Sequence, residues 1–253
     1  MGLVETEAIV LHTHKLADAD KIVVSLTEKA GLVRGVARGA RRLKSRFGAS
    51  LEPFTLVSMT FYEKETRELV TIKSAEIIKS YFGAAADSDT VAALEQLVEL
   101  VREFAPPHQA DERLFRMLRA CIEALAGGLA DPQPVFTYSE LWVLKLMGFL
   151  PDLRVCGACG TDLRAGGQRD LYITQEGVLW CTACRGGGAR TLKREAYELL
   201  YSARSLKPGE WSSEYSARAQ ETRQAASDIS RGLVRRALEA EPRAGKFAKR
   251  SAG

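Results

Sequence analysis

The sequence predicts an α+β protein of several domains, with an N-terminal β-barrel followed by a helical C-terminal domain that contains an inserted cysteine-rich ribbon. Three observations lead to this prediction. Residues 1–80 consist of short runs rich in Val, Ile, Thr, Phe and Tyr, whereas apolar residues recur at helical spacing from residue 81 onward. Two Cys-x-x-Cys pairs interrupt the helical part within residues 154–190. A chain of 253 residues can bury a substantial core and form one to three domains.

The first eighty residues predict a small barrel. Alternation of apolar and polar residues, with turn residues between the runs, predicts about five strands, over residues 5–12, 21–28, 32–38, 54–63 and 69–78. In the third strand, Val33, Gly35 and Ala37 share one face, and small residues there let a strand coil sharply enough to close a barrel. Five strands in a segment of this size match the OB-fold, a five-stranded partly open barrel. We therefore expect an OB-fold domain over residues 1–80.

Helical periodicity begins after the fifth strand. Apolar residues three and four positions apart predict five helices, over residues 87–105, 114–125, 134–147, 192–205 and 213–239. Asp87 to Asp89 mark the start of the first helix, and Pro or Gly residues end the first three, Gly127-Gly128 the second. We expect these helices to form one domain in two parts, residues 81–153 and residues 191–241. The small and basic residues 242–253 predict a disordered tail.

The net charge of +4 is unevenly distributed. Residues 1–80 carry +3 and residues 193–253 carry +5, whereas residues 81–155 carry −5. Two basic ends around an acidic middle indicate a polyanionic partner. A membrane partner is not expected, because the longest stretch without Asp, Glu, Lys or Arg has ten residues, whereas a membrane span needs about 20. The absence of a secretory signal and the few cysteines point to a reducing cytoplasm.

Four of the five cysteines form two Cys-x-x-Cys pairs, Cys156 with Cys159 and Cys181 with Cys184, separated by 21 residues. This is close to the spacing of a four-cysteine zinc ribbon, which we expect over residues 154–190. Each pair presents two thiolates to one ion, and the glycines beside the first pair allow the tight turn. Four thiolates leave no position for water, so the predicted single zinc ion per chain is structural. An iron–sulfur cluster is the alternative.

Two runs without acidic residues predict contacts with nucleic acid. Residues 29–46 hold seven cations on a strand and the loop that follows it, an arrangement that suits a phosphate backbone, while an adjacent ring can stack on a base. The predicted DNA-binding residues are Arg34, Arg38, Arg41, Arg42, Lys44 and Arg46, with Phe47 as the stacking ring. A second run follows the second cysteine pair and is a possible extension of this surface: Arg185, Arg190, Lys193 and Arg194. Either run could instead be a solvated charged face.

We identify no catalytic residues. The three histidines lack the partners that a hydrolytic or metal site would need, and a zinc deaminase would require His-x-Glu and Pro-Cys-x-x-Cys, neither of which occurs. Phosphate-binding loops, dinucleotide-binding fingerprints and nucleophile elbows are also missing. A binding protein is the simplest interpretation of these absences.

Residues 148–153 (Gly-Phe-Leu-Pro-Asp-Leu) run directly into the first cysteine pair. Four further motifs lie in the N-terminal part, at residues 7–11 (Glu-Ala-Ile-Val-Leu), 19–23 (Ala-Asp-Lys-Ile-Val), 31–33 (Gly-Leu-Val) and 37–42 (Ala-Arg-Gly-Ala-Arg-Arg). Together they resemble the RecO family of bacterial recombination mediators. The resemblance covers nearly the whole chain to about residue 240, and its most specific part is the junction before the first cysteine pair. One departure is Glu176-Gly177 before the second cysteine pair, where the family usually has Gly-Gly.

The resemblance implies a DNA repair role without an active site. RecO-like proteins bind single- and double-stranded DNA and promote annealing of complementary strands. They act with RecR to load RecA onto single strands coated by single-stranded-DNA-binding protein, in the cytoplasm at the nucleoid. The resemblance also implies the zinc site at the four paired cysteines and DNA contacts on the basic face of the barrel. The alternative is a structural zinc-ribbon subunit, or one that serves RNA or protein assembly.

Overall fold

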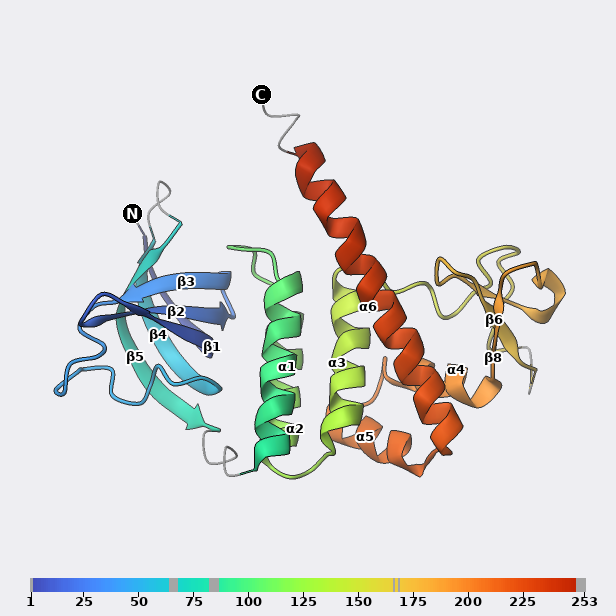
Figure 1. Ribbon diagram of the computed structural model, residues 1–253, viewed down its shortest axis with the longest axis horizontal. Coiled ribbons are helices and arrows are strands. Elements are labelled where there is room, and N and C mark those ends of the chain that lie inside the picture. The colour runs from blue at the N-terminus through green and yellow to red at the C-terminus, as the bar shows by residue number, and fades with distance from the viewer. Residues whose placement is uncertain (1, 64–67, 82–86, 166, 168, 249–253) are drawn as a thin grey trace. The chain divides into compact units, whose positions relative to one another are not determined.

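The structure of the chain is a computed structural model that describes residues 2–63, 68–81, 87–165, 167 and 169–248, with side chains described up to residue 240 (Figure 1). The chain divides into two compact units, Met1–Pro132 and Gln133–Gly253. The first two helices therefore belong to the same unit as the strands. None of the described helices combines the length and the apolar character that crossing a membrane requires.

The first unit contains a closed five-stranded barrel. Going around it, the strand order is β1-β2-β3-β5-β4, and β4 pairs with β1 to complete the circle. Neighbours are antiparallel except β3 and β5, which run parallel and pair only at Gly35 with Val70 and at Val36 with Thr71. This architecture is consistent with the predicted OB-fold, and all five strands overlap the predicted ranges: β1 (Gly2–Leu16), β2 (Asp20–Thr27), β3 (Gly31–Ala37), β4 (Thr55–Glu63) and β5 (Val70–Ser80).

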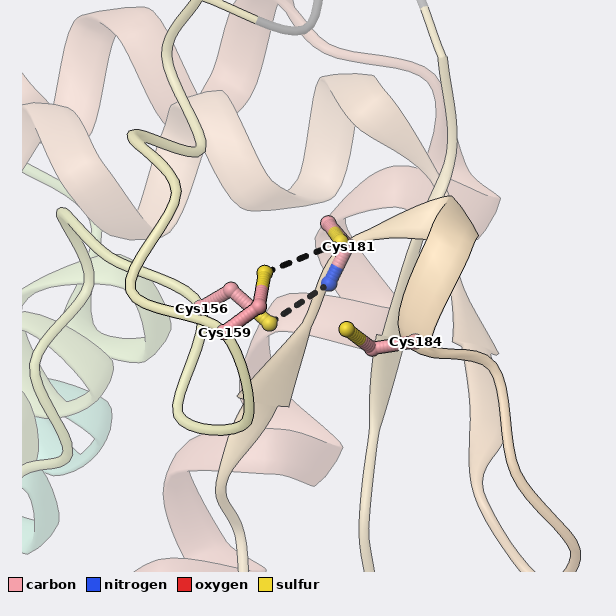
Figure 2. Close-up of side chains that lie close together, drawn as sticks. All are labelled: Cys156, Cys159, Cys181 and Cys184. Atoms are coloured by element: carbon pink, nitrogen blue, oxygen red, sulfur yellow. Dashed lines mark hydrogen bonds between the residues drawn. The ribbon is translucent and has the colours of Figure 1, made fainter.

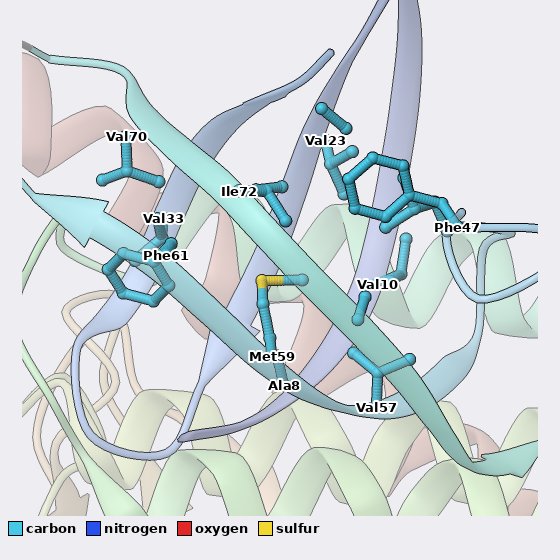
Figure 3. Close-up of a cluster of buried hydrophobic side chains, with 13 residues drawn as sticks. Ala8, Val10, Val23, Val33, Phe47, Val57, Met59, Phe61, Val70 and Ile72 are labelled. Atoms are coloured by element: carbon cyan, nitrogen blue, oxygen red, sulfur yellow. The ribbon is translucent and has the colours of Figure 1, made fainter. Parts of the chain in front are cut away.

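The barrel interior is filled by side chains from alternate positions of its strands (Figure 3). Along β3, residues 31, 33, 35 and 37 are buried, while the residues between them face outward. A Cβ atom on Gly35 would lie 2.7 Å from Cγ1 of Ile72, so only glycine lets β3 approach β5 this closely. The interior residues are Ala8, Val10, Val23, Val33, Ala37, Phe47, Leu51, Val57, Met59, Phe61, Val70, Ile72 and Ala75.

Helices α1 (Ser88–Phe104) and α2 (Glu112–Ala126) start where the sequence places capping residues. The Asp87 carboxylate accepts a hydrogen bond from the amide of Thr90, and the Asp111 carboxylate accepts from the first amides of α2. Helix α1 ends just before Pro106, which cannot continue it. The predicted start and stop of α1 and the predicted glycine stop of α2, at Gly127, are therefore confirmed, whereas the Asp111 cap of α2 is not among the predicted signals.

Polar contacts tie α2 to the barrel. The guanidinium of Arg119 lies 3.1 Å from the carboxylate of Glu7 on β1 and 3.3 Å from that of Glu123 on its own helix. Glu123 in turn accepts a 2.8 Å hydrogen bond from the hydroxyl of Tyr81, directly after β5. Burial and this carboxylate together raise the pKa of Tyr81 far above its ordinary value, so it stays a hydrogen-bond donor. These contacts fix α2 against both β1 and the end of β5.

The second unit consists of four helices and a small ribbon. The ribbon is a three-stranded sheet in the order β7-β6-β8, inserted between the first two helices of the unit. Its elements in chain order are α3 (Pro132–Leu146), β6 (Leu171–Ile173), β7 (Leu179–Trp180), β8 (Arg190–Leu192), α4 (Arg194–Ser202), α5 (Pro208–Ala217) and α6 (Gln220–Ala248).

The C-terminal helices differ from the prediction of one helix over residues 213–239. The chain breaks after α5, because Arg218 has an extended backbone, and a second helix starts at Gln220. Neither glycine nor proline marks this break, so periodicity alone could not locate it. Helix α6 continues through residues 242–248, where we expected a disordered basic tail, and residues 249–253 lie outside the described residues.

Aromatic side chains and one carboxyl group are buried among these helices. Trp211 is fully buried and donates a 2.9 Å hydrogen bond to the carbonyl of Leu199. Glu140 on α3 is only 2% exposed, and its Oε2 has no hydrogen-bond partner within the described residues. Burial raises the pKa of Glu140 to about 7, against the smaller lowering effects of Ser230 and the positive charge of Arg231. The carboxyl group is therefore neutral in slightly acidic solution.

This buried acid makes the stability of the second unit depend on pH. The pKa of Glu140 is about 7 in the folded chain against 4.5 in its ordinary state, so its stabilising neutral form is lost as pH rises through this window. We predict that Glu140→Gln raises the free energy of unfolding at pH 8 by about 2–3 kcal/mol and flattens its dependence between pH 5 and pH 8. Urea unfolding followed by tryptophan fluorescence measures this, because Trp142, Trp180 and Trp211 all lie in the second unit.

The exposed Glu195 provides the control, since Glu195→Gln should leave the pH dependence unchanged. Equal pH profiles for the wild type and Glu140→Gln would contradict the assignment.

Candidate metal centre and nucleic-acid interface

The four paired cysteines come together in the ribbon (Figure 2). Their sulfur atoms all lie within 4.8 Å of one another, and the Sγ atoms of Cys159 and Cys181 are 3.7 Å apart. Four sulfurs at about 2.3 Å from a tetrahedral zinc ion would be separated by about 3.8 Å. The observed separations therefore fit one metal ion with a small contraction of the cluster.

The backbone around the first pair forms the turn that presents its sulfurs. The amide of Gly160 donates a 2.8 Å hydrogen bond to the carbonyl of Cys156, and Gly160 has φ +73°, a conformation that side chains disfavour. A Cβ atom on Gly157 would lie 2.2 Å from Cγ1 of Val178, so the hairpin can only pack here against a glycine. The expected role in the turn is thus confirmed for Gly160, whereas Gly157 is needed for close packing and has no left-handed backbone.

Hydrogen bonds and neighbouring thiols change the acidity of the cluster. Burial raises the pKa of Cys156, but amide donors, first that of Cys181 at 3.3 Å, lower it by more. The side chain and amide of Thr161 lower the pKa of Cys159 to about 6. Contacts with Cys159 and the other cysteines raise the pKa of Cys184 to about 12, a mutual effect that a bound cation would reverse. Cys156 and Cys159 thus favour the thiolate, the form that binds metals, whereas Cys184 keeps its proton until a cation binds.

The hairpin before the second pair rests on α6. Gly177 has φ +86°, and a Cβ atom there would lie 2.6 Å from Cδ2 of Leu233. Glu176 does not share this backbone conformation. The turn therefore needs glycine only at its second position, and the departure from Gly-Gly is compatible with the turn.

The predicted cations of the barrel form an exposed surface. Arg34 and Arg38 follow the outward positions of β3, and Arg38, Arg42 and Lys44 have no ion pair among the described residues. Arg34 lies 3.4 Å from Glu68, but both side chains are at least half exposed, so the pair holds it weakly. Arg41 differs, because its guanidinium donates to the carbonyls of Ala17 and Asp18 and thereby fastens the loop to the β1–β2 turn. We call the exposed cations Arg34, Arg38, Arg42, Lys44 and Arg46 the basic loop surface.

Phe47 is not part of that surface. Its ring is 3% exposed and packs in the barrel interior with Val23 and Ile72, as Figure 3 shows. The guanidinium of Arg46 covers it from outside, 4.9 Å from the ring centre. A ring in this position cannot reach a base, and we withdraw Phe47 as the stacking residue. A residue next to a run of cations can close a barrel as readily as bind DNA, and the sequence pattern does not distinguish the two.

The second basic run is only partly available. Arg194 is 7% exposed and donates to the carbonyls of Leu163 and Arg164 while pairing with Glu198, so it holds the ribbon against α4 and is withdrawn as a DNA contact. Lys193 pairs with Asp170 at 3.0 Å. The exposed members without an ion pair among the described residues are Arg185, which lies over the ring of Tyr172, and Arg190.

Comparison of the sequence with known proteins identifies the family of the chain. A model of "Recombination protein O N terminal" matches residues 1–81, and a model of "Recombination protein O C terminal" matches residues 85–245. The chain belongs to the RecO family. Relatives from several bacteria carry the name DNA repair protein RecO. That of a Nocardioides species is 35% identical over 234 residues, 92% of this chain and 93% of the relative.

Two further relatives show similar levels of identity. The protein of Koribacter versatilis is 35% identical over 161 residues, which cover 64% of this chain and 65% of the relative. That of Bifidobacterium longum is 36% identical over 216 residues, 83% of this chain and 85% of the relative. The resemblance found in the sequence motifs is thereby confirmed, and the chain is a DNA repair protein of the RecO family.

The position of Phe47 in this RecO family member gives a testable consequence. Phe47→Ala should lower the free energy of unfolding of the barrel by about 3–5 kcal/mol, because it leaves a cavity in a packed interior. Hydrogen exchange of the strand amides in increasing urea measures this loss, and tryptophan fluorescence of the second unit serves as the internal control. A stable barrel with weakened DNA binding would instead restore the stacking role.

Proposed function

We propose that this protein is a non-enzymatic DNA repair and recombination mediator that binds single- and double-stranded DNA and promotes annealing of complementary strands. The observation that carries the proposal is the basic loop surface, which stands on the barrel without an acidic residue between Lys29 and Arg46. Lys and Arg side chains bind phosphates and release condensed counterions, whatever the base sequence. Membership of a DNA repair family supports DNA as the polyanion.

The same chemistry accounts for annealing. Two complementary strands repel each other through their phosphates, and a surface that neutralises several phosphates on each strand lowers this barrier. Exposed cations on a strand and its loop can follow a flexible backbone without selecting a sequence. No bond is made or broken in the DNA, so annealing needs no catalytic residue.

Family membership also supports a set of partners. We propose that the protein acts with RecR to load RecA onto single strands coated by single-stranded-DNA-binding protein, in the cytoplasm at the nucleoid. The second candidate function is a zinc-ribbon subunit for RNA or protein assembly. Phosphate contacts alone do not separate DNA from RNA, so the two functions must be compared on both nucleic acids.

We further propose that the cysteine cluster holds one structural zinc ion through Cys156, Cys159, Cys181 and Cys184. Zinc would bind all four thiolates, offset half of their negative charge and link the first cysteine turn to the 3-10 turn Thr182–Cys184. The ribbon strands contain only two or three residues each, so their sheet has few hydrogen bonds of its own. A cross-link between its two turns therefore supplies much of what keeps the ribbon folded.

The metal prediction is one zinc ion per chain with no inorganic sulfide, measured by elemental analysis and sulfide determination. Removing zinc with a chelator at neutral pH should unfold the ribbon, because structural zinc contributes on the order of 10 kcal/mol in small domains. The fluorescence of Trp180 on β7 should report this, while hydrogen exchange of the barrel stays unchanged. Iron with stoichiometric sulfide would identify a cluster instead.

The DNA prediction compares two pairs of exposed cations. Arg42→Glu with Lys44→Glu should weaken binding to single-stranded DNA and flatten the log–log dependence of affinity on salt by about 1.4, at about 0.7 per lost phosphate contact. Arg113→Glu with Arg116→Glu on α2 changes the net charge equally at exposed sites and should change the slope far less. Fluorescence anisotropy over a salt series measures both.

Annealing of complementary strands should slow in the first pair and not in the second. If the two pairs behave alike, net charge and not the basic loop surface governs binding. Faster annealing of RNA than of DNA at matched salt would favour the second candidate function.

A further inference from the structure

An apolar side chain stands in the middle of the basic loop surface. Leu43 has a relative exposure of 107%, more than any other large apolar residue of the described chain. Its neighbours in sequence are Arg42 and Lys44, both exposed. Full exposure of a leucine forgoes the free energy that its burial would contribute, so the position invites a partner that covers it.

The loop is braced on both sides of Leu43. The amide of Arg42 donates to the carbonyl of Gly39 at 3.1 Å, and the amide of Ser45 donates to the carbonyl of Arg42 at 2.9 Å, which forms two successive turns. Before Leu43, the amide of Gly39 donates to the carboxylate of Asp20 at 2.8 Å.

Two larger anchors complete this bracing. The guanidinium of Arg41 is held by the carbonyls of the β1–β2 turn, and Phe47 is inserted in the barrel interior. These anchors fix the loop in a conformation in which the side chain of Leu43 points into solvent and does not pack on the barrel core.

We propose that Leu43 is a base-contacting wedge, which enters between bases of a DNA strand whose phosphates are held by the surrounding cations. This inference rests on the proposed DNA-binding function. Cations on both sides of the leucine place phosphates beside it, and the apolar faces of the bases lie one deoxyribose away from those phosphates. Leucine is among the apolar side chains that proteins insert at base steps, where they unstack neighbouring bases.

Leu43 would thus make the base contact that the sequence predicted for Phe47, whose ring is buried in the barrel. Stacking or insertion adds base contacts that do not depend on salt, whereas phosphate contacts do. A strand whose bases are partly unstacked by Leu43 presents them to a complementary strand, which would assist annealing. The contribution of Leu43 is therefore separable from that of the cations by its salt dependence.

The experiment uses the full chain and a single-stranded oligonucleotide that contains 2-aminopurine, whose fluorescence rises when it is unstacked. Leu43→Ala should weaken binding about fivefold at every salt concentration, with the salt slope of the wild type preserved. It should also reduce the fluorescence rise at saturating protein. Leu43→Phe should retain both, because a ring in the same position can insert or stack. Leu129→Ala is the matched control, since Leu129 is 72% exposed but lies in the turn after α2 and has no Lys or Arg beside it in the sequence.

The outcomes separate this inference from the proposed function. If Leu43→Ala binds and unstacks like the wild type while Arg42→Glu with Lys44→Glu weakens binding, the wedge is wrong and the DNA surface stands. If neither variant changes binding, the basic loop surface itself is wrong, and the wedge with it.

A basic loop with an exposed leucine could also meet an anionic membrane. Sedimentation with vesicles of phosphatidylserine and phosphatidylcholine tests this with the same variants. Vesicle binding that requires Leu43, together with unchanged DNA binding in Leu43→Ala, would overturn the inference in favour of a lipid surface.

Discussion

The short contact between β3 and β5 closes the barrel, and the position of the basic loop surface follows from that closure. Only two residue pairs join these parallel strands, and Gly35 must be a glycine because any side chain there would strike Ile72. Closure turns residues 33, 35 and 37 inward and thereby places Arg34 and Arg38 on the outside. The loop that follows β3 then places Phe47 among the side chains of the barrel interior. The alternation of side chains along β3 thus accounts both for the packed residues inside the barrel and for the cations outside it.

Much of this arrangement could be predicted from the sequence, because it depends on local patterns. Strands of alternating polarity, helix caps such as Asp87 and Asp111, and the two cysteine pairs are each encoded within a few residues. The burial of Phe47 and Arg194 could not be predicted in this way. Phe47 meets strands distant in sequence, and Arg194 is buried because carbonyls of residues 163 and 164 receive its guanidinium. The sequence around Arg194 gives no local sign that its side chain is buried and hydrogen-bonded to the ribbon backbone.

The hydrogen bonds of Arg194 also fasten the ribbon to the helices of the second unit. Arg194 starts α4 and reaches back to the loop between the cysteine pairs, while Gly177 lets the hairpin lie against Leu233 of α6. The ribbon is thus fastened at its first loop and at its hairpin. The zinc ion that we propose would add a third attachment through the four cysteines, in a sheet whose strands are too short to be stable alone.

The turn between β2 and β3 has a consequence for how proteins of this kind can vary. A Cβ atom on Gly31 would lie 2.0 Å from the carbonyl oxygen of Gln109, and the amide of His108 donates to the carbonyl of Leu32. The segment between α1 and α2 therefore packs directly against that turn. A larger or inserted residue at Gly31 would collide with Gln109. Among the described residues, the tip of the loop after β3 around Leu43 makes no such contact with another element. A change of length or charge is therefore better tolerated at the tip of the basic loop surface than at the turn between β2 and β3.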